Sequence, residues 1–270
     1  MCPPKPKALE HVGGAVIILA DRCLGCSLYA RVCPIGAVDI EIEQKVVQTC
    51  DLCYYTEKRR GRMSTACILA GGQSTRMGTA KATLLLDGKT VLEHLVQTFQ
   101  PYFEDMCLVT RLDLSYSTVL IPKTYDRYAG VGPTAGIHAG LLFAKSDPVL
   151  MIAVDMPFAS PQIGLKLVSL LEAYEAVVPV IDGKRHPLFS VYRKSLATRY
   201  EAAILSGKRR VESIYEESRV RYVTAEELGL REEESAFFFF NMNTPEDYAW
   251  AQKKYESYKR LQLKRGGRIE

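Results

Sequence analysis

Residues 69–81 read LAGGQSTRMGTAK and begin at the end of an apolar run at 66–70. The apolar run predicts a buried strand. The three glycines after it allow the backbone to curl with its N–H groups facing inward, as in an anion-binding loop. Arg76 and Lys81 add two cations, and an arginine can bind a phosphate through two parallel hydrogen bonds. A strand that ends in such a loop indicates a site for phosphate groups.

Strands and helices alternate along the rest of the chain. Strands are predicted at 66–70, 106–110, 149–154 and 176–181, and helices at 91–99, 137–144, 163–174 and from Pro245 onward. Residues 188–192 are expected to pair with the strand at 176–181 across Asp182-Gly183. The continuous apolar run at 149–154 is typical of a strand buried on both faces. This order predicts an α/β fold with a doubly wound, mostly parallel sheet.

Length and composition limit the number and kind of domains. The 270 residues suffice for one large or two modest domains, and 47% hydrophobic residues exclude a disordered chain. Residues 56–62 (TEKRRGR) interrupt the periodic pattern with charge and a glycine, which indicates a linker. We therefore expect a cysteine module with its linker at 1–63 and the α/β domain at 64–270. The basic tail at 253–270 is expected to be a solvated helix end and not a nucleic-acid-binding surface.

The N-terminal sequence bears on location and on the cysteines. The apolar run at 15–20 is far too short to cross a bilayer, and the first ten residues lack the pattern of a secretory signal. We therefore expect no membrane partner and a cytoplasmic location. Because the cytoplasm is reducing, the eight cysteines are expected to be ligands and not disulfides. Cys2, Cys67 and Cys107 are scattered singly and are expected to be incidental.

A single carboxylate, Asp155, ends the apolar run at 149–154. Ligands of open α/β sheets bind at the carboxyl ends of strands, so this aspartate is expected opposite the glycine loop. One carboxylate together with phosphate oxygens suits Mg²⁺. The alternative is an aspartate that only caps the following turn, but the glycine loop favours the metal.

Several separated motifs resemble those of the molybdenum cofactor guanylyltransferases, within the wider nucleotidyltransferase family. They are the loop at 69–81, then GPTAGI at 132–137, DMPF at 155–158, HPL at 186–188, SGKRR at 206–210 and NMNTPED at 241–247. The resemblance extends from about residue 65 to residue 252 and implies a Rossmann-like fold. It also implies transfer of GMP from Mg-GTP to the phosphate of molybdenum-bound molybdopterin, with release of pyrophosphate.

The resemblance also assigns the nucleotide half of the site. It implies that Lys81 binds the nucleotide phosphates and that Asp155 binds Mg²⁺. The other implied nucleotide-binding residues are Leu69, Ala70, Gly71, Gly72, Asp126 and Thr110, the last at a position where the family often has asparagine. The incoming phosphate is already an anionic nucleophile, so the reaction needs alignment and charge neutralisation more than covalent chemistry. We therefore expect Arg76, Lys81 and Asp155 to be the catalytic residues.

Three further segments are candidates for binding the molybdopterin substrate. They are Lys208, Arg209 and Arg210, then His186, and finally Asn241 and Asn243. The basic run is expected to receive the phosphate of the pterin, although a solvated helix start explains the same residues. The histidine is expected to orient this substrate or to be a structural turn residue. The asparagines are expected to face the site, although a helix cap beside them explains part of the motif.

Five cysteines lie within 31 residues, namely Cys23, Cys26, Cys33, Cys50 and Cys53. Residues 23–34 resemble the bacterial ferredoxin run C-x₂-C-x₂-C-x₃-C-P with Tyr29 in place of the third cysteine, and a second run stops halfway. Three interpretations stay open for this incomplete ferredoxin-like module. It binds a [4Fe–4S] cluster, or it binds Zn²⁺ through the first two and last two cysteines, or it binds no metal. A fused cluster module would dock the enzyme on an iron–sulfur protein or a molybdoenzyme.

Two other functions remain open. One is an enzyme of the same fold that uses CTP or a sugar-phosphate acceptor. The choice of nucleotide stays open because no residue type in the motifs is specific for the guanine base. The other is an iron–sulfur electron carrier or cofactor chaperone whose transferase domain only binds the cofactor. The presence of Arg76, Lys81 and Asp155 argues against this non-catalytic alternative.

Overall fold

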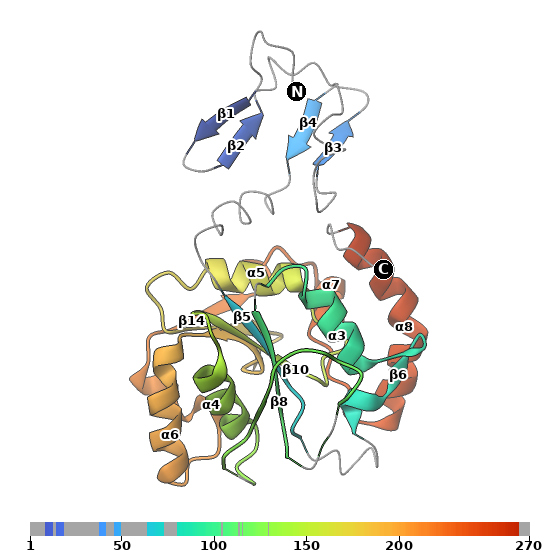
Figure 1. Cartoon of the computed structure of the whole chain (residues 1–270). Helices are drawn as coiled ribbons and strands as arrows, with labels where there is room; N and C mark the ends of the chain where they lie inside the picture. The colour runs from blue at the N-terminus through green and yellow to red at the C-terminus, as the bar shows by residue number, and fades with distance from the viewer. Residues whose placement is uncertain are drawn as a thin grey trace. The chain divides into compact units, whose positions relative to one another are not determined.

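The computed structural model describes residues 64–72 and 80–264, apart from 104, 113, 115 and 129, together with four short strands before residue 50. Side chains are described for the residues from 64 to 260 within these ranges. The chain divides into two compact units, one of Met1–Arg62 with Arg260–Glu270 and one of Met63–Lys259. Figure 1 labels many of the elements of both units.

The first unit contains two pairs of antiparallel strands. β1 (Leu9–Val12) pairs with β2 (Ala15–Ile18), and β3 (Val38–Glu41) pairs with β4 (Val46–Thr49). All five clustered cysteines lie outside the described residues. The iron–sulfur or zinc site expected from them therefore stays a prediction.

One mixed sheet of eight strands organises the second unit. Its strands are β5 (Thr65–Leu69), β8 (Asp105–Thr110), β9 (Lys123–Tyr125), β10 (Val149–Ala153), β11 (Ala176–Ile181), β12 (Lys184–Arg185), β13 (Phe189–Tyr192) and β14 (Val220–Thr224). Their order is β12-β11-β13-β10-β5-β8-β9, with β14 paired to β11. β9, β8, β5 and β10 run parallel, whereas β13 is antiparallel to both β10 and β11. The sheet has mostly parallel strands, as the sequence predicts.

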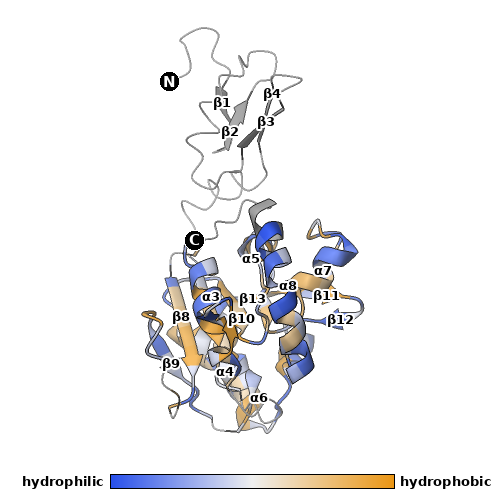
Figure 2. Cartoon of the chain, turned by 90° about the vertical axis from the view of Figure 1, so that its right-hand side faces the viewer, coloured by the Kyte–Doolittle hydropathy of each residue, from blue (hydrophilic) through white to orange (hydrophobic). Residues whose placement is uncertain are grey.

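Helices connect these strands and flank the sheet (Figure 1). They are α3 (Val91–Phe99), α4 (Pro133–Phe143), α5 (Pro161–Ser169), α6 (Ala197–Leu205), α7 (Glu232–Phe238) and α8 (Pro245–Lys264). Shorter elements are the 3-10 helices η2 (Lys81–Thr83), η3 (Lys194–Leu196) and η4 (Val211–Glu217), and the hairpin of β6 (Leu85–Leu86) and β7 (Lys89–Thr90). Figure 2 shows that β8 and β10 are coloured mainly as hydrophobic strands.

Two neighbouring residues of β10 show how the helices cover the sheet. Successive side chains of a strand point to opposite faces. A Cβ atom added to Gly164 of α5 would lie 2.6 Å from Leu150 Cδ2, and one added to Gly140 of α4 would lie 3.1 Å from Met151 Cε. Helix α5 therefore covers one face and α4 the other, which gives a three-layer α/β/α unit. Because every residue of β10 is buried, this strand lies at the centre of the core.

The predicted elements differ from the structure mainly at their ends. α4 begins at Pro133, earlier than predicted, because proline suits the first turn of a helix. α5 ends at Ser169, earlier than predicted, and Glu172 beyond it has a φ of 38° that no α-helix contains. The predicted pairing across Asp182-Gly183 is confirmed. Their φ angles of 49° and 73° suit a tight turn, and β11 pairs with β12 there and with β13 further on.

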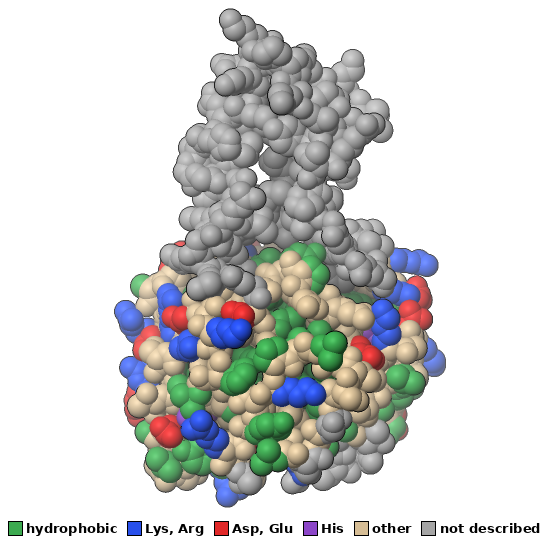
Figure 3. Space-filling view, viewed as in Figure 1, with side chains coloured by type: hydrophobic (Ala, Val, Ile, Leu, Met, Phe, Trp, Pro, Cys, Tyr) green, Lys and Arg blue, Asp and Glu red, His purple; other side chains and the backbone are tan. Residues whose placement is uncertain are grey.

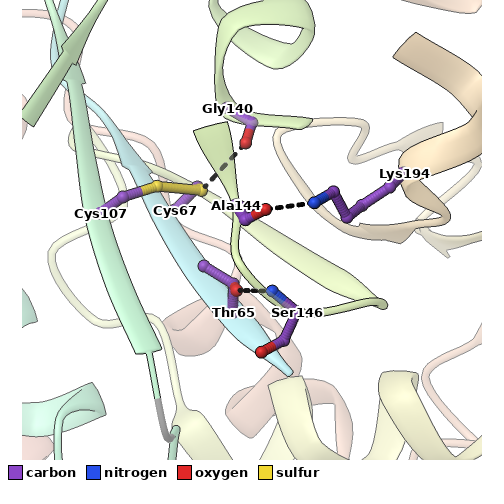
Figure 4. Close-up of a disulfide and its surroundings, with 7 residues drawn as sticks. All are labelled: Thr65, Cys67, Cys107, Gly140, Ala144, Ser146 and Lys194. Carbon is purple, nitrogen blue, oxygen red and sulfur yellow. Dashed lines mark hydrogen bonds between the residues drawn. A yellow bond between two sulfur atoms is a disulfide. The ribbon is translucent and has the colours of Figure 1, made fainter. Parts of the chain in front are cut away.

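Cys67 and Cys107 form a disulfide, so the expectation that they are incidental and unpaired is wrong. They are register partners on the neighbouring parallel strands β5 and β8, and their Cα atoms are 4.8 Å apart. Cys67 Sγ lies 3.8 Å from the carbonyl oxygen of Gly140 on α4, as Figure 4 shows. The spacing between paired strands brings these side chains together. The sequence does not reveal the pair because the register depends on the whole sheet.

Helix α8 is fastened to the β6–β7 hairpin and to α3. The hydroxyl of Tyr248 donates to the carbonyl of Leu85 (2.8 Å), and the hydroxyl of Tyr255 lies 2.6 Å from Nδ1 of His94. Burial lowers the pKa of His94, which keeps this imidazole neutral near pH 7. The hairpin follows directly on η2, whose first residue is Lys81. These bonds hold α8 beside the segment that carries the lysine.

The described surface carries charges of both signs. Figure 3 shows Lys/Arg and Asp/Glu side chains interspersed on the visible face of the described residues. In this part of the chain, no helix combines the length and the apolar character that crossing a membrane requires.

Candidate active site

The carboxyl ends of β5, β8 and β10 lie side by side at one edge of the sheet. Leu69 at the end of β5 is the register partner of Val109 on β8 and of Ala153 on β10. The Ala70 N–H donates to the carbonyl of Val109 (2.8 Å), and the Val154 N–H donates to the carbonyl of Leu69 (3.1 Å). The segments that follow these strands are therefore joined at the edge where open α/β sheets bind ligands.

This register collects the residues expected to bind a nucleotide. They are Leu69, Ala70, Gly71 and Gly72 at and after the end of β5, Thr110 at the end of β8, Asp126 after β9 and Asp155 after β10. The Asp126 N–H donates to the carbonyl of Thr110 (3.3 Å), which ties the end of β9 to the end of β8. The structure thus places all of these residues along one edge.

Lys81 connects this edge with the segment that precedes α8. Its Nζ donates to Oδ2 of Asp155 (3.2 Å) and to Oδ1 of Asn243 (2.7 Å). The ion pair is partly buried, with 15% of the lysine and 24% of the aspartate side chain exposed. The N–H of Met242 donates to the backbone carbonyl of Asp155 (2.8 Å). The lysine, the acid and the asparagine therefore meet although they come from three distant segments.

The second carboxylate oxygen of Asp155 fits a metal ion. Oδ1 is buried and has no hydrogen-bond partner among the described residues. A buried anionic oxygen without a partner is costly, and a divalent cation would satisfy it. The described residues contain no group of three or more His, Cys, Asp or Glu side chains that could enclose a metal. The donor set therefore fits Mg²⁺ held by one carboxylate together with phosphate oxygens.

Thr110 and the glycine loop offer further polar groups to a ligand. Thr110 is fully buried, and its Oγ1 has no hydrogen-bond partner among the described residues. A Cβ atom added to Gly72 would meet no atom within 4 Å, so the described protein leaves open space beside this backbone. A polar ligand can therefore approach the glycine backbone closely.

Arg111 and Tyr116 also contact the glycine loop, and the sequence does not single them out. The hydroxyl of Tyr116, which is buried, donates to the carbonyl of Ala70 (3.3 Å). Cγ of Arg111 would lie 3.6 Å from a Cβ atom added to Gly71. The position of Arg111 directly after a predicted strand is a signal that could have found it. For Tyr116 no such pattern exists, because its contact depends on the path of the chain after β8.

Asp126 lies beside titratable groups of α4 and α6. Its Oδ1 accepts the N–H of Tyr128 (2.8 Å), and burial raises the pKa of Asp126. The hydroxyl of Tyr128 donates to Glu201 (2.9 Å), and Nε2 of His138 lies 4.0 Å from the same carboxylate. Burial lowers the pKa of His138. The backbone of Tyr128 therefore orients Asp126 at the sheet edge.

His186 and Asn241 meet at one aromatic residue. The rings of His186 and Phe239 are 4.8 Å apart in an edge-on arrangement, and Nδ2 of Asn241 donates to the carbonyl of Phe239 (3.0 Å). The N–H of Ala153 donates to the carbonyl of Leu188 (2.8 Å), so the segment after the histidine borders the end of β10. The structure therefore brings two of the residues expected to bind molybdopterin together at this edge.

The basic run Lys208, Arg209 and Arg210 lies in the exposed loop after α6. The hydroxyl of Thr134, in the first turn of α4, donates to the carbonyl of Arg209 (2.6 Å). Because α4 follows β9, its first turn lies at the carboxyl edge of the sheet. The basic run is therefore attached to that edge. Arg76 lies outside the described residues, so its catalytic role stays a prediction.

A glycine-rich strand end, a lysine and a strand-end aspartate at the carboxyl edge of a mostly parallel sheet define an α/β nucleotidyltransferase. The family of MobA-like NTP transferase domains matches residues 66–222, and the chain belongs to this family. A "Probable molybdenum cofactor guanylyltransferase" of Carboxydothermus hydrogenoformans is 36% identical over 186 residues, which cover 68% of this chain and 92% of that relative. One of Bacillus cereus is 31% identical over 192 residues, which cover 69% and 94%.

A solved structure shows the same fold. Molybdopterin-guanine dinucleotide biosynthesis protein A from Archaeoglobus fulgidus matches with a TM-score of 0.62 and 30% identity, over 72% of this chain and 99% of that protein. The predicted α/β fold and the predicted class of enzyme, a nucleotidyltransferase, are confirmed.

The ring of His186 leads to a prediction about pH. Burial, assisted by the nearby charge of Lys184, lowers the pKa of His186 to about 4 from its ordinary value of 6.5. Between these two values the unfolded chain binds a proton that the folded protein does not bind. The free energy of unfolding therefore decreases as the pH falls through this window. We expect an NMR titration of the ring to show a neutral imidazole throughout the upper part of the window.

The His186→Gln variant provides the control for this prediction. Its urea denaturation should show a smaller loss of stability between about pH 7 and about pH 5 than the unchanged protein shows, because glutamine binds no proton in this range. A ring that titrates at its ordinary value of 6.5 would contradict the prediction.

Proposed function

We propose that the protein is a Mg²⁺-dependent guanylyltransferase of molybdenum cofactor synthesis. It transfers GMP from GTP to the phosphate of molybdenum-bound molybdopterin and releases pyrophosphate, which gives the guanine dinucleotide form of the cofactor. The meeting of Lys81, Asp155 and Asn243 at the carboxyl edge of the sheet carries this proposal. The relatives named for this activity, at 36% and 31% identity, support the choice of GTP and molybdopterin.

The reaction forms one bond and breaks one bond. An oxygen of the molybdopterin phosphate bonds to the α-phosphorus of GTP, while the bond from that phosphorus to the bridging oxygen of pyrophosphate breaks. The acceptor is already an anion, so the chain does not have to remove a proton from it. The protein therefore contributes chiefly alignment and positive charge.

Asp155 and Lys81 supply these contributions in the proposed site. Asp155 would hold Mg²⁺ through its buried Oδ1, and an ion held there would supply positive charge to the nucleotide phosphates. The ammonium of Lys81, 3.2 Å from the other oxygen of Asp155, binds phosphate oxygens. Arg76, five residues before Lys81 in the glycine loop, is the third catalytic residue of the proposal.

The remaining nucleotide contacts come from the three strand ends. The backbone of residues 69–72 binds the nucleotide at the open space beside Gly72. The buried hydroxyl of Thr110 takes the place of the asparagine amide that the family often has, and Asp126 binds from the end of β9. These groups present hydrogen-bond donors and acceptors to a base and a ribose.

We assign the acceptor phosphate to the exposed basic run after α6. The basic run Lys208, Arg209 and Arg210 is attached to the first turn of α4, where it can bind an anion. His186 and Asn241, joined through Phe239, contact the pterin portion of the substrate. In this arrangement the two substrates approach Lys81 from different segments of the sheet edge.

The Asp155→Asn variant tests the metal assignment. The amide keeps the shape of the side chain and loses the charge that holds Mg²⁺, so we expect kcat for pyrophosphate release from GTP to fall at least about 100-fold. The Asp105→Asn variant is the matched control, because Asp105 lies at the amino end of β8, at the opposite edge of the sheet. Thermal unfolding followed by circular dichroism checks that both variants fold. Full turnover by Asp155→Asn would overturn the assignment.

For the N-terminal segment we propose a module of residues 1–63 that binds a [4Fe–4S] cluster through four of its five clustered cysteines. The spacing of Cys23, Cys26 and Cys33 supports this proposal, since it resembles a ferredoxin run. The transferase domain, residues 64–270, does not need the cluster for its chemistry. We therefore propose that the module docks the enzyme on an iron–sulfur partner or a molybdoenzyme.

Iron and acid-labile sulfide in anaerobically purified protein test this module. We expect about four of each per chain and a brown colour. Replacing Cys23 and Cys26 by serine should remove the iron and leave the transferase activity unchanged. Zinc in place of iron, or a colourless protein without metal, would reject the cluster.

A further inference from the structure

The ammonium of Lys81 is closer to an amide than to its acidic partner. Nζ lies 2.7 Å from Oδ1 of Asn243 and 3.2 Å from Oδ2 of Asp155. A carboxylate attracts an ammonium more strongly than an amide oxygen does, so the shorter distance to the amide shows that the lysine is shared between the two. The other oxygen of Asp155, Oδ1, is buried without a hydrogen-bond partner among the described residues and stays available for a cation.

Asn243 is held in place by the start of helix α8 and not by burial. Its side chain is exposed, but its N–H donates to Oδ2 of Asp247 (2.8 Å). The same carboxylate oxygen accepts the N–H of Thr244 (2.8 Å), and the Thr244 hydroxyl accepts the N–H of Asp247 (3.2 Å), which completes a capping box. On the other side, Met242 is fully buried and bonded to the backbone of Asp155. Both neighbours thus fix where the amide oxygen lies.

We propose that Asn243 is a positioning residue for Lys81. Its amide oxygen holds the ammonium partly away from Asp155, so that the carboxylate can bind Mg²⁺ while the lysine faces the nucleotide phosphates. This inference rests on the proposed function and assigns Asn243 to the nucleotide half of the site. Asn241, whose amide bonds to the carbonyl of Phe239, stays with the molybdopterin half.

The inference separates two asparagines that lie two positions apart. Without the amide oxygen of Asn243, Lys81 turns further toward Asp155 and competes with Mg²⁺ for the carboxylate. Binding of Mg-GTP then weakens, whereas binding of molybdopterin does not change. Loss of the Asn241 amide instead weakens binding of molybdopterin and leaves binding of Mg-GTP unchanged.

Calorimetric titration of the full chain with GTP in the presence of MgCl₂ tests this inference. For Asn243→Ala we expect the dissociation constant of GTP to rise about tenfold, the usual effect of losing one hydrogen bond to a charged group. The KM for molybdenum-bound molybdopterin should stay within about twofold. The Asn243→Gln variant keeps an acceptor oxygen, so it should recover most of the GTP affinity. The Gln252→Ala variant removes an exposed amide from α8 and should bind GTP as the unchanged protein does.

Two results would overturn the inference. In the first, Asn243→Ala binds Mg-GTP with unchanged affinity and shows a raised KM for the molybdenum-bound pterin, which would return Asn243 to the molybdopterin half. In the second, the glutamine variant is as weak as the alanine variant. Failure of the proposed function is distinguishable from both, because the unchanged protein would then bind no Mg-GTP at all.

Discussion

The ion pair between Lys81 and Asp155 is the contact on which the rest of the site depends. The lysine follows the glycine loop, the aspartate follows β10, and Asn243 joins both from the start of α8. A partly buried ion pair interacts more strongly than one in open water, but its chief consequence here is geometric. It fixes a positive charge and the carboxylate proposed to bind the metal beside each other, so that little has to be rearranged when the phosphates bind.

The register of the parallel strands places this pair. Because β5 pairs with both β8 and β10, the residues after Leu69, Val109 and Ala153 reach the same edge. The same register sets Cys67 beside Cys107 inside the core. Helices α4 and α5 pack on the two faces of the sheet, and they approach β10 closely because Gly140 and Gly164 lack side chains. The site is therefore a consequence of how the core packs.

Short sequence patterns predict the local features of this fold and site. The glycine loop, the aspartate after a buried strand and the helix start at Thr244-Pro245 are local features, and the structure has each of the described ones at the expected place. The position of β13 between β10 and β11, the disulfide and the bond from Lys81 to Asn243 are not local. They depend on strand order and on contacts between distant positions, 40 apart in the sequence for the disulfide and 162 apart for Lys81 and Asn243, which no single pattern records. For the same reason, the sequence leads to the same expected role for both asparagines of the 241–247 motif, namely binding of molybdopterin. In the structure their side chains bond to different partners.

In the mechanism that we propose, the residues at the strand ends provide charge and alignment for transfer of a nucleotide to a phosphate acceptor, and family membership directs that chemistry to GTP and molybdopterin. The most direct measurement is the product that the purified protein forms from molybdenum-bound molybdopterin and each of GTP, CTP, ATP and UTP, identified by mass spectrometry together with released pyrophosphate. The proposed mechanism predicts the guanine dinucleotide product from GTP, with every other nucleotide at least about tenfold slower. Equal turnover of CTP, or no dinucleotide from any of the four, would contradict it.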